Sequence, residues 1–363
     1  MVTRKKRRIA AVPEQPSGSL ALQMPPEKAE PASMGNVLMM VVPMLGSTGV
    51  MIFMAMQNNG GGRSMLMGGG MLVAMLGMVG FNMYRQFSQY RTRVKTQRRE
   101  YLSYLAETRE SIRKVAKKQR AYYNWVYPDP DALVTLAANG SRLWSREGNT
   151  YNVLTFRYGS GTQPLGLTFE RPPIDPMTEM DVVCLSAMER FIAVHDHTDN
   201  VGKFLYLGDF SHIEVVGEGE SAYDEMRAIM MHLACFIEPS KLKIAVLCSA
   251  DRLGDWEWVK WMPQARSANV RDAIGPARMI STDPRELVEM IGPDIAMRGA
   301  YRPGEEMPEW PHLLLVCDGA EFPTSSPFGS MAGVRGVTIM SRAREWTPMK
   351  SHTALRLVIH PSP

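Results

Sequence analysis

Near the middle of the chain, the stretch "EVVGEGES" that begins at Glu214 has the spacing of a partial phosphate-binding loop. A working loop of this class reads G-x-x-x-x-G-K-[ST], because a glycine-lined turn directs backbone N–H groups at the phosphates and a lysine neutralises their charge. Gly217, Gly219 and Ser221 stand where such a loop uses them, but Glu214 replaces the leading glycine and Glu220 replaces the lysine. The stretch therefore has the turn of a nucleotide site without its cation.

The acidic side chains of this stretch oppose a bound nucleotide. A carboxylate about 4 Å from one phosphate charge costs on the order of 4 kcal/mol at an effective dielectric of about 20, which is roughly a thousandfold in affinity. The alternative is an ordinary strand-to-helix turn, in which acidic residues favour the start of a helix. Both interpretations place the loop between a strand and a helix that begins near Ala222.

A nucleotide site also needs an apolar strand that ends in one carboxylate for Mg²⁺ and a second one to polarise the attacking water. The stretch "HLLLVCDGAE" offers Asp318 for the first role, but Gly319 stands in the place of the second. An acidic residue that merely caps a strand end is the alternative for Asp318. We expect no catalytic residue in this chain. The predicted degenerate nucleotide-site positions are Gly217, Gly219, Glu220, Ser221 and Asp318.

Metal-ligating residue types occur without metal-ligand spacing. The run "HDH" at 195–197 has no third ligand at a recognisable distance along the chain. The four cysteines are widely spaced inside apolar runs and form no C-x-x-C pair. We therefore predict no metal site and four reduced, buried thiols.

The elements that must position these residues alternate between strand and helix after residue 150. Short apolar runs such as "HIEVV", "LKIAVLCS", "HLLLVCDG", "GVTIMS" and "LRLVIH" are separated by stretches with helical spacing. Buried strands that alternate with helices predict a largely parallel sheet covered on both faces. The predicted fold class is therefore α/β, with a degenerate P-loop ATPase-like, Rossmann-like domain over 126–363.

Two uncharged runs of about twenty residues, 37–56 and 65–84, precede this domain. That length crosses a hydrocarbon core of roughly 30 Å, so the runs predict a two-span transmembrane hairpin. Basic residues lie outside the hairpin, in "RKKRR" at 4–8 and from Arg85 onward. The bias predicts a multi-pass protein with both termini in the cytoplasm.

From Arg85 to about 125 the chain has no proline or glycine, and apolar residues recur at helical spacing. This pattern predicts a helical stalk that ends at the prolines of "YPDPDAL". The basic residues at the start of the stalk would face anionic lipid. The stalk has no surface that interleaves basic with aromatic residues, so nucleic-acid binding is not indicated. The predicted domains are a cytoplasmic arm over 1–33, the hairpin over 34–84, the stalk over 85–125 and the ATPase-like domain over 126–363.

Several longer stretches together resemble a known family. They are "RREYLSYLAETRESI", "PDPDAL", "SRLWSR", "FRYGSGTQPL", "DRLGDWEWVKWMPQA", "DAIGPARMISTD" and "GVTIMS". The combination is similar to the FtsK/SpoIIIE-type membrane ATPase of type VII (ESX) secretion systems, the EccC/EssC family, and within it to the N-terminal part of actinobacterial EccC. The tryptophans of "WEWVKW" would then be a packing element between helix and sheet.

The resemblance implies a bacterial inner (cell) membrane protein whose further ATPase domains lie downstream of this segment. Full-length family members use ATP and Mg²⁺, whereas we expect no cofactor in this segment. The implied partners are the membrane subunits EccB, EccD and EccE, other copies of the same protein and, through downstream domains, secreted WXG100-class substrates. Two alternatives stay open: the anchor of an FtsK/SpoIIIE-like DNA translocase, and a membrane-tethered scaffold without a motor.

Overall fold

A computed structural model describes most of the chain. The chain divides into two compact units, and each is described by itself. The sheet unit comprises Met1–Gln15, Arg120–Gln163 and Asp199–Pro363, and the helix unit comprises Pro16–Gln119 and Pro164–Thr198. The described residues are 13–30, 63–140, 142–146, 151–173, 175–304, 309–343, 349 and 353–360, with isolated positions between 39 and 57.

The sheet unit is built on a six-stranded sheet with the strand order β12-β5-β11-β10-β6-β9. Every neighbouring pair in it is parallel, as the alternation of strands and helices predicts. The central strand β10 is buried along its whole length, which explains its uninterrupted apolar sequence. The strands are β5 (His212–Gly217), β6 (Leu242–Cys248), β9 (Ile280–Ser281), β10 (His312–Asp318), β11 (Val337–Ala343) and β12 (Ala354–Ile359).

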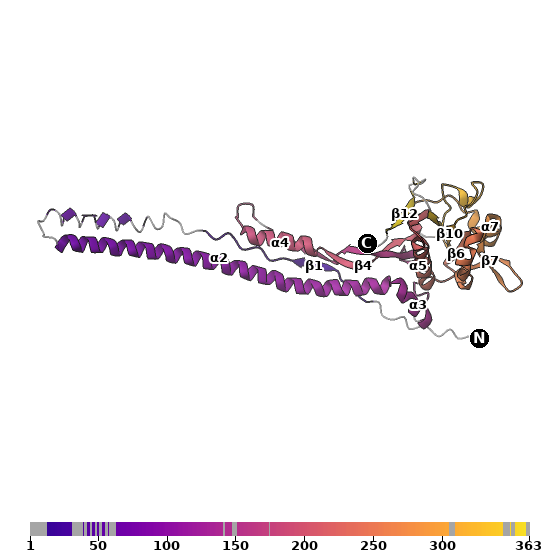
Figure 1. The fold of residues 1–363 in the computed structure, drawn as a ribbon, viewed down its shortest axis with the longest axis horizontal. Coiled ribbons are helices and arrows are strands. Elements are labelled where there is room, and N and C mark those ends of the chain that lie inside the picture. Colours follow the sequence, from indigo (N-terminus) through magenta and orange to yellow (C-terminus); the bar gives the residue numbers. More distant parts are fainter. Residues whose placement is uncertain are drawn as a thin grey trace. The chain divides into compact units, whose positions relative to one another are not determined.

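Helices cover both faces of this sheet (Figure 1). Alternate residues of one strand separate the two cores: Ile244 and Val246 of β6 belong to the core with α5 (Ser221–Phe236), whereas Leu247 belongs to the core with α7 (Pro284–Ile291). Period-two alternation of this kind is expected because successive strand side chains point to opposite faces. The result is a three-layered α/β/α arrangement.

Shorter elements complete the sheet unit. Aspartates cap two of its helices: Asp129 caps α3 and Asp283 caps α7. Strand β2 pairs with β4, and β7 pairs antiparallel with β8. These elements are α3 (Pro130–Asn139), β2 (Thr155–Pro164), β4 (His197–Tyr206), α6 (Leu253–Trp256), β7 (Arg266–Arg271), β8 (Pro276–Arg278) and α8 (Pro293–Ala296).

The helix unit contains most of α2 (Arg63–Val126), a single helix of 64 residues. The parallel pair β1 (Gly18–Ala21) and β3 (Leu167–Glu170) and the helix α4 (Val182–His195) belong to the same unit. Their shared core combines residues of α2 at helical spacing with residues of α4 and of the strands. Its buried members are Leu22, Tyr101, Leu105, Ile112, Leu165, Cys184, Met188 and Phe191.

Buried polar contacts fix the helix unit in one register. Gln119, only 2% exposed, donates to the carbonyl of Pro164 at 2.8 Å and accepts the backbone N–H of Gly166 at 3.0 Å. Asp181 caps α4 by accepting the N–H groups of Val183 and Cys184, both at 3.1 Å. Each of these buried polar groups therefore has a hydrogen-bond partner, as is general for buried polar groups.

The predicted transmembrane hairpin is wrong. Among the residues that the structure describes, no helix combines the length and the apolar character needed to cross a membrane. The second predicted span, 65–84, is the first part of α2, which continues without a break into the predicted stalk. Five of its twenty residues are glycines, which supply little of the transfer free energy that leucine, isoleucine, valine and phenylalanine provide.

The structure tests the other parts of that prediction to different extents. The first predicted span, 37–56, lies mostly outside the described residues, as do 1–12 of the predicted cytoplasmic arm. The inferred inner-membrane, multi-pass location with both termini cytoplasmic rested on the hairpin, and the same finding contradicts it. By contrast, α2 ends at Val126, directly before the prolines that were expected to stop it.

Candidate functional site

The loop between β5 and α5 is a tight turn at the carboxyl edge of the parallel sheet. Gly219 has a φ of +59°, in the left-handed region that glycine adopts without strain. A Cβ added to Gly217 would lie 2.5 Å from the Oγ of Ser221, so a larger residue there would displace the Ser221 hydroxyl. The Ser221 hydroxyl donates to the carbonyl of Glu218 at 2.7 Å. The turn that the sequence predicts is present, but its hydroxyl is bonded to the loop itself.

Asp318, the last residue of β10, is only 1% exposed and lies in a ring of donors. Its Oδ2 accepts hydrogen bonds from the Nε of Arg252 at 3.1 Å and from the indole Nε1 of Trp256 at 3.0 Å. Its Oδ1 lies 3.8 Å from a guanidinium nitrogen of Arg342. Oδ2 is therefore engaged in two hydrogen bonds to side chains of the chain itself, and Oδ1 lies within ion-pair distance of a third.

Arg252 links this carboxylate to the lysine-replacing position of the loop. Its guanidinium lies 3.4 Å from Glu220 and 2.9 Å from Asp255, in addition to its bond to Asp318. Although burial acts to lower it, the hydrogen bonds to Asp318 and Glu220 raise the pKa of Arg252 above its ordinary value. We call Arg252, Trp256, Asp318 and Glu220 the arginine clamp. It places a cation of the protein beside the position where the predicted loop lacks one.

Two of the acidic side chains at the loop, Glu214 and Glu220, are paired with arginines, contrary to the premise of unpaired carboxylates. Glu214 on β5 accepts from the Nε of Arg356 on the neighbouring strand β12 at 2.9 Å. Arg342 on β11 also donates to the carbonyl of Gly219 at 3.4 Å. Repulsion between unpaired carboxylates and phosphate therefore overstates the obstacle. The stronger obstacle is that Asp318 is already occupied by an arginine.

The tryptophans of "WEWVKW" differ in burial and in what they contact. Trp256 is fully buried, with its ring 4.9 Å from that of Tyr223 on α5, in the packing role that the sequence analysis predicts. Its bond to Asp318 was not predicted. Trp261 is 78% exposed, so for this residue the packing prediction is wrong.

Metal binding finds no support in the part of the chain that the structure covers. Among those residues, no group of three or more His, Cys, Asp or Glu side chains is placed to hold a metal ion. His197 pairs through Nδ1 with the adjacent carboxylate of Asp196. All four cysteines are buried and unbonded to one another, as expected.

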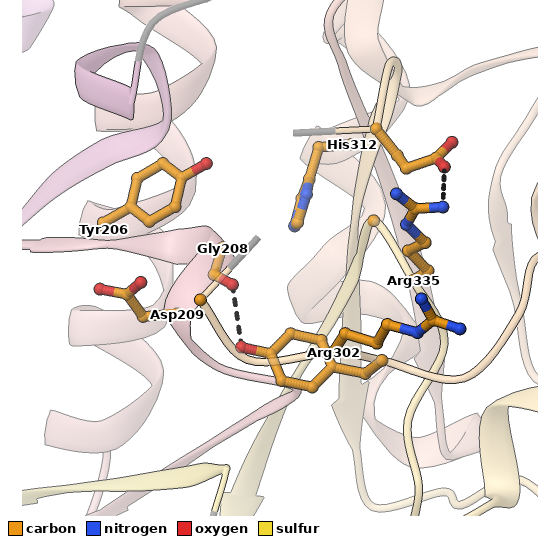
Figure 2. A pocket seen from close by; sticks show the side chains of 10 residues that line it. Tyr206, Gly208, Asp209, Arg302, His312 and Arg335 are labelled. Carbon is orange, nitrogen blue, oxygen red and sulfur yellow. Dashed lines mark hydrogen bonds and ion pairs between the residues drawn. The ribbon is translucent and has the colours of Figure 1, made fainter. Parts of the chain in front are cut away.

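A second hollow lies at the opposite, amino edge of the sheet, where β10 and β11 begin (Figure 2). His312 points into it, Glu309 and Arg335 form an ion pair of 3.1 Å beside it, and Arg302 lines it. Burial, followed by the repulsion of Arg298, lowers the pKa of His312 to about 3. The cavity volume is about 30 Å³, which admits water but not a nucleotide, since small-molecule sites occupy roughly 300–1,000 Å³.

Comparison with known proteins decides the ancestry. No protein-family model matches the chain. Over 363 residues the chain is 30% identical to an ESX secretion system protein EccC of Thermomonospora curvata, an alignment that covers 99% of this chain and 27% of that protein. The chain belongs to the EccC family.

Other EccC proteins are similarly related. The chain is 33% identical over 249 residues to the ESX-3 secretion system protein EccC3 of Mycobacterium tuberculosis, which covers 68% of this chain and 18% of that protein. The ESX-5 secretion system protein EccC5 of Mycobacterium marinum is 29% identical over 339 residues, or 90% of this chain and 24% of that protein. The chain thus spans between 18% and 27% of these EccC relatives.

In this EccC chain the structure brings together the five residues singled out as degenerate nucleotide-site positions. Gly217, Gly219, Glu220 and Ser221 form one turn, and Glu220 connects to Asp318 through Arg252. Arg252, Trp256 and Arg342 were missed as members of the site. They follow or belong to other strands, and the sequence carried no signal that they converge. That the five predicted residues descend from a nucleotide site stays a prediction.

Proposed function

We propose that this chain is the non-hydrolysing part of the motor subunit of an ESX, or type VII, secretion system. Membership of the EccC family supports the assignment to secretion. The six-stranded parallel sheet with a glycine turn at its carboxyl edge supports an ATPase-like domain. Its role is to position and couple, and the chemistry belongs to other parts of the motor.

The observation that carries this proposal is the bond from Arg252 to Asp318. A magnesium ion would have to displace a guanidinium from a carboxylate that is 1% exposed. Losing a hydrogen bond to a charged group costs about 1.5–3 kcal/mol, or roughly one to two orders of magnitude in affinity. Glu220 adds no positive charge for the phosphates. The clamp therefore holds the site in a state that does not require nucleotide.

Nucleotide titration tests the proposal. We expect isothermal titration calorimetry of the chain with Mg-ATP to show no saturable binding tighter than about 1 mM, and phosphate release to match that of buffer. The fluorescence of Trp256, beside Asp318, provides a second readout at the site itself. Micromolar binding that Asp318→Asn abolishes would show that the clamp opens and that the proposal is wrong.

We further propose that this segment takes part in a multi-subunit complex with EccB, EccD and EccE and with other copies of itself. The support is its membership of a family of ESX secretion system proteins. Export of WXG100-class substrates, with ATP and Mg²⁺, is assigned to the complete motor. Affinity capture of the tagged chain from an ESX-bearing actinobacterium tests the partnership. Recovery of EccB, EccD and EccE is expected, and their absence alongside intact bait would contradict it.

A further inference from the structure

The carboxyl end of α2 is a helix terminus that needs partners from elsewhere in the sheet unit. The last carbonyls of any helix have no intrahelical donors, and their partial negative charge attracts cations. Residues Arg120–Val126 of α2 belong to the sheet unit, and the last turn of the helix contains no basic residue of its own. Its cations must therefore be supplied by other segments.

Three arginines supply them. Arg142 donates through Nη2 to the carbonyl of Trp125, and Arg146 donates through Nη2 to the carbonyl of Val126 at 3.0 Å. Arg157, on β2, donates to the carbonyl of Tyr127 at 3.1 Å. Three successive carbonyls at the end of α2 thus each accept a guanidinium N–H.

The same segment also binds the end of a second helix through its main chain. The backbone N–H of Trp144 donates to the carbonyl of Cys235 at 2.8 Å, and that of Arg146 donates to the carbonyl of Phe236 at 3.1 Å. These are the last two residues of α5. Trp144 has a φ of +54°, which is uncommon for a residue with a side chain and directs the backbone into this turn.

Aromatic rings and burial hold the guanidinium groups in place. Arg142 stacks on Trp125 at 3.9 Å from the ring centroid, and Arg146 lies 4.9 Å from the ring of Phe236. Burial lowers the pKa of Arg146 to about 10, so it remains a cation at neutral pH. Within the described part of the chain neither arginine forms an ion pair with a carboxylate. Their charges are compensated by helix carbonyls and rings instead.

We propose that residues 142–146, together with Arg157, form a joint that fastens the end of α2 to the end of α5. One short segment caps both helices: its arginine side chains bind the end of α2 and its main chain binds the end of α5, where Nη2 of Arg146 also lies 3.0 Å from Nε2 of His232. The two helix ends therefore open and close together. Because α5 begins at Ser221, a displacement of the Gly217–Ser221 turn along α5 reaches the last turn of α2 through this joint. The inference holds whether or not a nucleotide binds.

Hydrogen exchange of the complete chain, followed by mass spectrometry, tests the joint from the side of α2. Arg146→Gln removes the positive charge and shortens the side chain that donates the hydrogen bonds. We expect exchange to become about tenfold faster or more in both 122–127 and 232–237, while β6 and β10 keep their protection. Arg146→Lys, which keeps the charge, should give an intermediate result in both segments. The exposed Arg285 on α7 provides a matched control, Arg285→Gln.

A reciprocal variant tests the joint from the side of α5. Phe236→Leu removes the ring against which both guanidinium groups lie and leaves α2 itself unchanged. Faster exchange in 122–127 is the expected result. If Phe236→Leu loosens 232–237 and leaves 122–127 unchanged, the two caps are independent and the joint does not exist. These readouts use no nucleotide, so their failure is separate from failure of the proposed function.

Discussion

At the scale of single residues, the behaviour of the site is determined by which cation each carboxylate meets. Sequence reasoning identified the acidic residue of the loop and the aspartate at the strand end, Glu220 and Asp318. It missed Arg252, Arg342 and Arg356, because they approach from a turn after β6 and from β11 and β12. Only folding brings these distant charges within bonding distance, so local spacing carries no trace of them.

Removing Arg252 should destabilise the sheet unit strongly. Arg252→Gln leaves Asp318 buried with Trp256 and only the more distant Arg342, so we expect a loss of about 2–4 kcal/mol in the free energy of unfolding. Urea denaturation measures it, with Arg285→Gln as control. Adding Asp318→Asn to Arg252→Gln should recover part of the loss, since the uncompensated charge is removed. A variant as stable as the control would contradict the clamp.

The pH dependence of stability should carry the signature of Glu225 on α5. Burial, which outweighs the attraction of Arg157, raises the pKa of Glu225 from 4.5 to about 7. A raised pKa means that the folded state retains the proton, so this contribution to stability is complete below about pH 4.5 and is lost as the pH rises through about 7.

Glu225→Gln removes that dependence. We expect the variant to be more stable than the unsubstituted chain by about 1–2 kcal/mol at pH 8, after allowance for solvent screening, and equally stable near pH 4.5. Urea denaturation at both pH values measures this difference. The exposed Glu289 on α7 gives the control Glu289→Gln, which should show no such divergence. Equal stability of Glu225→Gln and the unsubstituted chain at pH 8 would contradict a raised pKa of Glu225.

At the scale of helices and strands, the sequence correctly predicted the features that depend on hydrophobic periodicity and on helix-ending prolines. The strands of the sheet and the end of α2 followed from local signals. The pairing of β1 with β3 did not, because Gly18–Ala21 has no alternating pattern and its partner lies far along the chain. The hairpin was predicted from the length and lack of charge of 37–56 and 65–84, but no helix among the described residues has the length and apolar character to cross a membrane.

A single buried amide should account for much of the stability around β3 in the helix unit. Gln119→Met keeps the approximate length of the side chain but leaves the Pro164 carbonyl and the Gly166 N–H without a partner. We expect a loss of about 2–3 kcal/mol in the free energy of unfolding, measured by urea denaturation. The neighbouring Lys118 is exposed, so Lys118→Met introduces the same residue as a control. Comparable stability of the two variants would contradict this account.

At the scale of the whole molecule, the glycine turn and the carboxylate at the carboxyl edge of the sheet are bonded to side chains of the chain itself. The family could be inferred from motifs spread along the chain, and comparison confirms it. The state of the site could not, because it depends on Arg252, Trp256 and Asp318 meeting in space. The central claim is therefore that a guanidinium occupies the place of the metal ion.

A crystal structure of the chain grown with magnesium and a non-hydrolysable ATP analogue tests that claim most directly. The account predicts that Arg252 and Trp256 remain bonded to Asp318 and that no phosphate lies against the Gly217–Ser221 turn. A phosphate held by that turn, with magnesium on Asp318 and Arg252 swung away, would contradict it.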